Sequence, residues 1–273
     1  MTSAESALPE FNDPPVNETA LSIQFAPLEK FGLPHYGLYW TKIRSDFAKF
    51  QTHVPLLSTT EQFGEALPGQ PQFGIQFITQ PDVRIWFLND SGSQIIQVQR
   101  DRFVHNWRQL TGKEKYPRYP AVKNTLQKEW ARFREFLKSE DLGTPQVNQC
   151  EVTYVNHIDY KKGWNDYGDL NKVIAAWSGQ KSGDFLPSPE KVNMDAHYLL
   201  PNKLGRLHIS VLPVIRGRDL QEVLQITLTA RGAPQSSQDE DVLGWIDLGR
   251  EWVVKGFADF TNDAMHRIWG RKT

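Results

Sequence analysis

The sequence predicts an α+β protein made of two similar halves, each running strand, helix, three strands, helix. Short segments alternate apolar and polar residues, which is typical of strands with one buried face. Two long segments carry apolar residues at helical spacing. Corresponding elements of the two halves are offset by roughly 130 residues, which indicates a long-period repeat. We expect a shared antiparallel or mixed sheet with the long helices packed on one face.

The first half is predicted to contain, in order, a strand over 20–25, a helix over 36–50, a loop over 51–72, and strands over 73–79, 83–89 and 94–100. Its long helix covers 119–138, because Pro120 suits a first helical turn and apolar side chains follow at helical spacing. This buried stripe is formed by Val122, Leu126, Trp130, Phe133 and Leu137.

The second half repeats this order. The predicted elements are a strand over 150–158, a short helix over 168–177, strands over 192–200, 206–215 and 221–230, and a helix over 247–268. Asp247 is the expected N-cap of the last helix, since aspartate accepts hydrogen bonds from free helical N–H groups. The domain boundaries that follow are a disordered polar tail over 1–17, a first half over 18–142 and a second half over 143–273.

Composition excludes several classes of function. The formal net charge of −1 gives no overall field that would attract nucleic acid or an anionic membrane. The single cysteine, Cys150, allows no intrachain disulfide and no cysteine-rich zinc site. There is no signal-peptide pattern and no apolar run near the ~20 residues of a membrane span, so we expect a cytoplasmic protein without membrane contact. The chain also lacks phosphate-binding, dinucleotide, zinc-protease and lipase motifs, and we expect no cofactor.

One face of the predicted sheet is polar. If the helices cover the apolar side, alternation places polar side chains on the other side. In the first half these are Gln76, Arg84, Trp86, Gln97 and Gln99; in the second half they are Asn193, Asp195, His197, Arg206, His208, Ser210, Gln225, Thr227 and Thr229. Such a face is either a solvated surface or a place where a polar partner binds.

Asp195, His197 and His208 are the candidate catalytic residues. A tight turn near 202–203 would place His208 opposite His197 and Ser210 opposite Asp195. Asp, His and Ser side chains on one face are able to form a hydrolytic or metal site, while the alternative is a polar sheet surface. We assign no metal site on this pattern alone.

The segment over 100–123 carries seven basic side chains against two acidic ones, with aromatic residues between them. This pattern suits phosphate contact with base stacking, and equally a linker anchored by its aromatic residues. Its candidate contact residues are Arg100, Arg108, Lys115 and Arg118. The long segment over 160–190 is a candidate binding loop through Trp164 and Tyr167, or it packs on its own sheet.

Four motifs together resemble a sporadically distributed, uncharacterised bacterial protein family. They are I-I-Q-V-Q-R-D-R-F-x-x-N-W-R, Y-P-x-Y-P, E-V-T-Y-V-N-H-I and F-x-x-x-T-x-x-x-M-H-R-I-W-G, within Asn17–Gly270. The resemblance implies no activity and transfers no catalytic residue. It implies an accessory gene cluster, of a mobile element, a phage-defence system or a toxin-neutralising system. Among the motif residues we assign structure to Asp101, Phe103 and Trp107, and contact to Gln99, Arg100 and Arg108.

The leading hypothesis is a non-enzymatic binding or adaptor protein with a macromolecular, most simply protein, partner. Its candidate contacts are Trp86, Gln97, Gln99, Arg100, Arg108, Lys115, Arg118, Trp164 and Tyr167. The alternatives are nucleic-acid binding through 100–123, and a hydrolase or nuclease built on Asp195, His197 and His208. The aromatic content also makes a homodimer a hypothesis to test.

Overall fold

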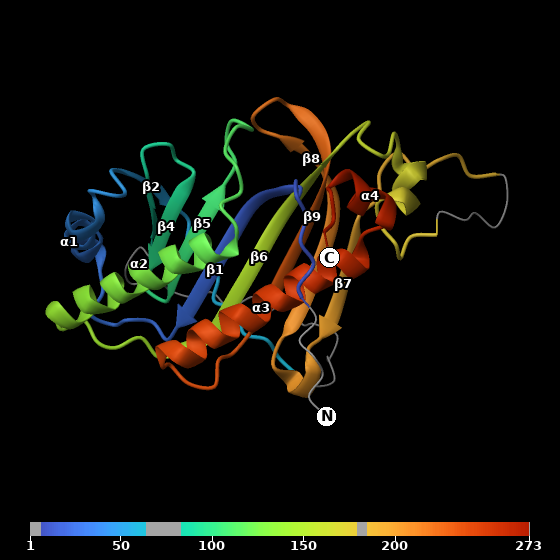
Figure 1. The fold of residues 1–273 in the computed structure, drawn as a ribbon. Coiled ribbons are helices and arrows are strands. Elements are labelled where there is room, and N and C mark those ends of the chain that lie inside the picture. Colours follow the sequence, from blue (N-terminus) through green and yellow to red (C-terminus); the bar gives the residue numbers. More distant parts are fainter. Residues whose placement is uncertain (1–6, 64–82, 179–184, 273) are drawn as a thin grey trace.

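A single antiparallel sheet organises the chain in the computed structural model, which describes residues 7–63, 83–178 and 185–272 (Figure 1). Its strands follow the spatial order β2-β3-β4-β5-β1-β6-β9-β8-β7. They are β1 (Val16–Phe25), β2 (Lys49–His53), β3 (Arg84–Leu88), β4 (Gln94–Gln99), β5 (Arg102–Arg108), β6 (Val147–Asp159), β7 (Met194–Leu199), β8 (Arg206–Arg216) and β9 (Gln221–Gly232).

Two long helices lie on one face of this sheet, as predicted (Figure 1). The helices are α1 (Leu33–Ile43), α2 (Tyr119–Ser139), α3 (Asp239–Phe260) and α4 (Asp263–Ile268), with short 3₁₀ turns η1 (Tyr167–Lys172) and η2 (Pro201–Lys203). The α+β class and the antiparallel sheet are thereby confirmed. Every residue of the predicted helical stripe on α2 is buried, because that stripe faces the sheet.

The two halves meet at the centre of the sheet, where β1 pairs with β6. Outward from this central pair, β5, β4 and β3 follow on one side, and β9, β8 and β7 follow on the other. In each half the last strand, β5 or β9, therefore lies next to the first strand, and the earlier strands follow outward. The apolar residues that alternate with the polar face are buried beneath the helices, as predicted for Phe87, Val98, Ile209 and Leu228.

Two first-half elements differ from the prediction. The helix expected over 36–50 ends at Ile43, and residues 49–53 form the edge strand β2. Phe47 lies beyond the end of the helix and is buried by tertiary packing, so its apolar spacing did not reflect a longer helix. Residues 102–108, expected to belong to a basic linker, form the inner strand β5 between β4 and β1. The strand expected over 73–79, including Gln76, lies outside the described residues.

The last helix is divided in two. The helix expected over 247–268 begins at Asp239 and ends at Phe260, where Thr261 takes an extended conformation and Asn262 caps α4 through a 2.9 Å bond from Ala264 N. Asp247 is therefore an interior residue and not an N-cap. The start lies at Asp239 because acidic residues in the first turn favour a helix N-terminus. The helix expected over 168–177 is the 3₁₀ turn η1, which ends at Lys172.

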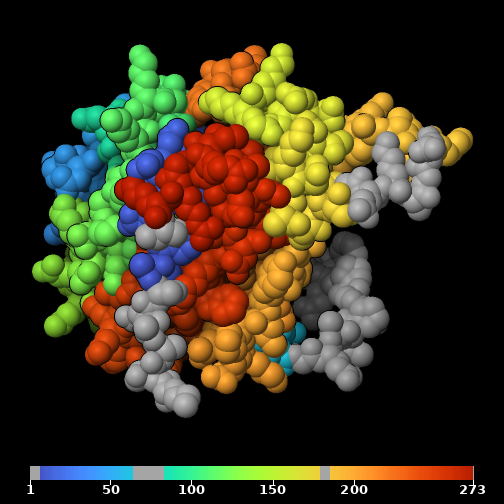
Figure 2. Space-filling model, turned by 45° about the vertical axis from the view of Figure 1, so that its right-hand side comes forward, coloured from blue at the N-terminus to red at the C-terminus, as the bar shows by residue number. Residues whose placement is uncertain are grey.

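The tail over 1–17, predicted to be disordered, contacts the C-terminal end of the chain from Glu10 onward. Phe11 is 5% exposed and forms edge-to-face contacts with Phe257 and Trp269. The backbone N–H groups of Asn12 and Asp13 donate to carbonyls of Gly270 and Trp269 at 3.0 Å. Figure 2 shows the blue N-terminal segment between green surface of the first half and the red C-terminal helices. This segment therefore closes the seam between α2 and the end of the chain.

Candidate functional site

The candidate site lies on the sheet face opposite α2 and α3, which we call the open face. Directly paired residues of antiparallel strands point to the same side, so the strand register fixes its members. The pairs are Trp86 with Gln97, Gln99 with Arg102, Gln24 with Gln149, Glu151 with Arg231, Arg231 with Arg206, and His208 with His197. Among the described residues, no helix packs on this face. Alternation along the strands therefore correctly predicted which side chains it carries.

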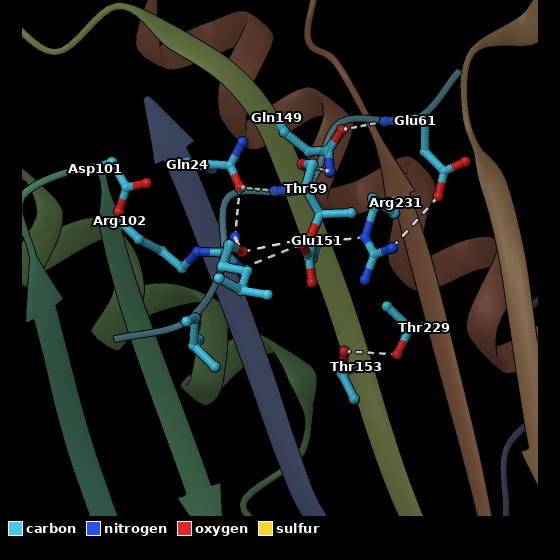
Figure 3. Close-up of polar contacts among 12 residues, drawn as sticks. Gln24, Thr59, Glu61, Asp101, Arg102, Gln149, Glu151, Thr153, Thr229 and Arg231 are labelled. Atoms are coloured by element: carbon cyan, nitrogen blue, oxygen red, sulfur yellow. Dashed lines mark hydrogen bonds and ion pairs between the residues drawn. The ribbon is translucent and has the colours of Figure 1, made fainter. Parts of the chain in front are cut away.

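An extended piece of chain crosses this face. We call residues 54–63 the crossing segment. Side-chain amides from the sheet bind its backbone: Gln99 both donates to and accepts from Leu56, each at 3.0 Å. Gln149 donates to Thr59 O at 2.5 Å and accepts from Glu61 N at 3.0 Å. Gln24 accepts from Thr59 N at 3.1 Å. Figure 3 shows Thr59 and Glu61 in front of the strands that carry Gln24 and Gln149.

Charges alternate beneath the crossing segment (Figure 3). The Arg102 guanidinium is buried, donates to the Gln24 side chain, and lies 3.3 Å from Glu151. The same Glu151 oxygen, Oε1, lies 3.1 Å from Arg231, and Arg231 also lies 3.6 Å from Glu61. This row lets each buried charge face an opposite one, which is the condition for keeping charges in a low-dielectric position.

Glu61 ends the row in a cationic recess. Its side chain is only 5% exposed and accepts from Arg206 and, at 2.5 Å, from His208 Nε2. Burial lowers the pKa of His208, and the Glu61 carboxylate opposes that shift. Arg206 also donates to Gln62 O at 3.3 Å. The recess, built by β8 and β9, is therefore shaped for a carboxylate.

A second cluster lies on the other half of the open face. The Trp86 cluster consists of Trp86, His53, Arg84 and Arg108. The His53 ring stacks on Trp86 with centroids 3.9 Å apart, and both guanidinium groups lie 5.5 Å from the indole centroid. Among the described residues, the buried indole N–H of Trp86 has no hydrogen-bond partner. Cationic groups around an aromatic ring suit a polar, anionic partner group.

A hydrogen-bonded chain supports this cluster from β4, β5 and β1. Arg84 donates to Gln97 at 3.0 Å, Gln97 donates to Asn106 at 2.7 Å, and Asn106 donates to Glu18 at 2.6 Å. Burial raises the pKa of Glu18, while the Asn106 bond and the nearby Arg108 charge act in the opposite direction. This series of hydrogen bonds fixes the orientation of Arg84 relative to Trp86. Asn106 had been noted only as a motif residue, and this network explains its position.

The candidate catalytic residues are paired in the expected register. His197 lies opposite His208 with ring centroids 4.6 Å apart, and Asp195 lies opposite Ser210. Asp195 and His197 are exposed on β7, whereas His208 is engaged by Glu61. In the described part of the chain, no cluster of three or more His, Cys, Asp or Glu side chains is arranged to hold a metal ion. The partner of His208 is thus a carboxylate from the crossing segment.

Two of the predicted contact residues belong to the core. Trp164 is fully buried and donates to Asp159 O at 3.1 Å, and Tyr167 packs against it with ring centroids 5.7 Å apart. The expectation that Trp164 and Tyr167 form an exposed contact surface is therefore corrected. Both rings pack with Tyr160 because a segment of this length needs an apolar anchor of its own.

The basic segment over 100–123 does not form one patch. Arg108 lies on the open face, while Arg100 is in the turn before β5, within 3.4 Å of Glu29. Arg118 lies on the helix side, where it donates to the carbonyls of Phe11 and Asn12 at 2.9 Å, and Lys115 is exposed in the preceding loop. Three of its aromatic residues are buried: Phe103, Trp107 and Tyr119. The basic side chains of this segment thus lie on different parts of the surface, and the aromatic rings that base stacking would need are buried.

Several site residues went unpredicted. Gln24, Glu151 and Arg231 continue the alternation of their strands onto the open face, so the same pattern could have identified them. Gln149, two residues before Glu151 on β6, also continues this alternation, whereas Glu61 had no such signal because its role depends on a loop meeting distant strands. None of the described helices is long and apolar enough to cross a membrane. No protein-family profile, no curated protein and no solved structure matches the chain.

Proposed function

We propose that this chain is a non-enzymatic binding protein whose open face holds a macromolecular partner. One observation carries the proposal: Arg84 and Arg108 flank Trp86 on the open face, and Gln97, which was expected to be a contact residue, is buried and instead supports Arg84 through a hydrogen bond. Aromatic and arginine side chains are the residue types that contribute most to binding when they lie together. The stabilised orientation of Arg84 and the position of Arg108 beside Trp86 favour recognition of a polar partner group.

A protein partner is favoured over nucleic acid. Base stacking on a single strand needs accessible rings along a basic track. Here Phe103 and Trp107 are buried in β5, and the charges of 100–123 are distributed over two faces and an edge. A polar face that already binds a stretch of polypeptide backbone argues for polypeptide as its ligand.

The genetic and cellular context is inferred from the family resemblance. We infer a cytoplasmic accessory protein of a mobile-element, phage-defence or toxin-neutralising gene cluster. We further infer that its two halves arose by duplication, which the mirrored strand order around the β1–β6 pair supports. In such a fold both halves contribute to one continuous binding face.

The test is a capture experiment with matched variants. Tagged wild-type protein and an Arg84→Glu/Arg108→Glu variant are recovered from the native host, with mass spectrometry of bound proteins and sequencing of bound nucleic acid. The control, Lys42→Glu/Lys138→Glu, makes the same charge change at exposed positions on the helix side. A stoichiometric protein that the open-face variant loses and the control retains supports the proposal. Nucleic acid that leaves with rising salt, or no difference between the variants, contradicts it.

A further inference from the structure

The crossing segment is held almost entirely by contacts that other polypeptides are able to make. Glutamine carboxamides bind its backbone N–H and C=O groups, which every residue except proline provides. Two of its apolar side chains add little burial, since Val54 is 81% exposed and Leu57 is 88% exposed, while Leu56 is 38% exposed, Phe63 is partly buried and the Arg206 guanidinium lies over the Phe63 ring. The hydrophobic contribution of Val54 and Leu57 to holding the segment is therefore small.

The binding groups come from the rigid part of the molecule. They share a position on the open face, in strands that are paired on both sides, and they are Gln24, Gln99, Gln149, Arg206, His208 and Arg231. All three glutamines are buried below the segment, and Arg102 fixes one of them by donating to Gln24. We call these six residues the peptide groove.

The groove has one strong chemical preference. Two guanidinium groups and an imidazole surround the Glu61 carboxylate, and one of these guanidinium groups, that of Arg206, also lies 5.6 Å from the centroid of the Phe63 ring. The two glutamines nearest to it bind backbone groups at Thr59 and Glu61, so the carboxylate stands at a fixed distance from the backbone contacts. A guanidinium pair favours carboxylate over neutral side chains by charge and by geometry.

We propose that the peptide groove binds an extended acidic segment of a partner protein, and that residues 56–61 occupy it as an internal substitute. This inference rests on the proposed function and names the part of the partner that is recognised. The partner segment lies across the strands, gives its backbone to the three glutamines, and places one Glu or Asp side chain between Arg206 and Arg231. Binding then requires the crossing segment to leave.

The probe is a fluorescent peptide of residues 54–63, Ac-VPLLSTTEQF-NH₂, added to the full chain and followed by anisotropy. The Glu61→Gln chain, whose own segment has lost its charge, is expected to bind the peptide. The wild-type chain is expected to bind at least about tenfold more weakly, because its attached segment competes at a millimolar effective concentration. Far-ultraviolet circular dichroism checks that the variant is folded, and Glu61→Ala serves as a second vacated chain.

Three altered peptides separate recognition of backbone and charge from recognition of this one sequence. A peptide with alanine at positions 56–60 is expected to bind within about threefold of the parent, since the hydrogen bonds that the groove makes there go to backbone atoms of positions 56 and 59. Replacing its glutamate by glutamine, or N-methylating the positions of Thr59 and Glu61, is expected to weaken binding at least about tenfold. Arg206→Gln in the vacated chain is expected to have the same effect.

Three results overturn the inference. Absence of peptide binding to both folded vacated chains means that the groove serves only its own segment. Failure of the alanine peptide means that the segment is an internal brace recognised by its side chains. A wild-type dimer in light scattering that the parent peptide dissociates means that the occupant is a second copy of this chain. If the capture experiment succeeds while the peptide fails, the proposed function stands and this inference falls; the converse result does the opposite.

Discussion

His105 is a buried imidazole in the middle of β5, on the helix side of the sheet. Its ring nitrogens lie 3.1 Å from the Val122 carbonyl oxygen and 2.7 Å from the Gln94 side chain. Burial lowers the pKa of His105 from 6.5 to about 4, and the hydrogen bond at Val122 opposes this only partly. The folded chain therefore holds a neutral ring where the unfolded chain holds a proton in mild acid.

This difference predicts a loss of stability in acid. The unfolded chain binds a proton on His105 below pH 6.5, and the folded chain does so only near pH 4, so the unfolding free energy falls as the pH drops through this window. The contribution is about 3 kcal/mol between pH 7 and pH 4. In urea denaturation, the stability difference between wild type and His105→Gln should shrink by that amount over this range. Parallel pH curves would contradict the assignment.

Arg102 carries a prediction about buried charge. Arg102→Met leaves Glu151 with Arg231 alone and leaves Leu57 O without its 3.1 Å donor, so we expect a loss of about 3 kcal/mol in unfolding free energy. The Arg102→Met/Glu151→Met double variant should lose less than the sum of the single variants by more than about 1 kcal/mol. The control, Lys30→Met, breaks an exposed ion pair with Asp141 and should leave the unfolding free energy nearly unchanged, because solvent screens exposed pairs. Additive losses would mean that the buried pair is not coupled.

Among the elements, those with one dominant pattern were predictable and those shaped by distant contacts were not. The stripe on α2 and the alternation in β8 and β9 correctly predicted these three elements and their buried faces. In β5 the same alternation was present, but Arg102 and Arg108 suggested a linker because their partners, Glu151 and the Trp86 cluster, belong to other strands. The break between α3 and α4 likewise depends on Thr261 and its cap, which apolar spacing does not register.

The N-terminal segment provides an element-scale prediction. Phe11 lies between Phe257 of α3 and Trp269 after α4, so Phe11→Ala should lower the unfolding free energy by about 3 kcal/mol. The control is Asp13, an exposed residue of the same segment whose backbone N–H donates to Trp269 O. Asp13→Ala keeps this bond and should change the unfolding free energy by no more than about 0.5 kcal/mol. Equal small effects in guanidinium denaturation would show that the segment is not part of the cooperative unit.

At the scale of the whole molecule, one sheet and one core join both halves. The open face was predictable as a surface because alternation is local to each strand. The peptide groove was not, since it brings Gln24, Gln99 and Gln149 from three strands to a loop without periodicity. Its location follows from tertiary pairing, which a single sequence does not encode in any local pattern.

The shared sheet predicts a single unfolding transition. Because β1 pairs with both β5 and β6, neither half has a sheet edge or a core of its own at the centre of the molecule. Thermal unfolding followed by far-ultraviolet and by near-ultraviolet circular dichroism should give superimposable curves, with equal calorimetric and van't Hoff enthalpies. Two separated transitions would mean that the halves are independent folding units.

The central β1–β6 pair also determines how late the centre of the sheet is completed during synthesis. Ser22 of β1 pairs with Glu151 of β6. At typical elongation rates the ribosome adds Glu151 on the order of ten seconds after Ser22, so this strand pairing is delayed by that time. Until then the apolar strand Val16–Phe25 has β5 as its partner on one side and an open hydrogen-bonding edge on the other. During this interval, the strand that will lie at the centre of the sheet is an exposed edge of the nascent chain. This edge is where we expect protection by chaperones to matter most.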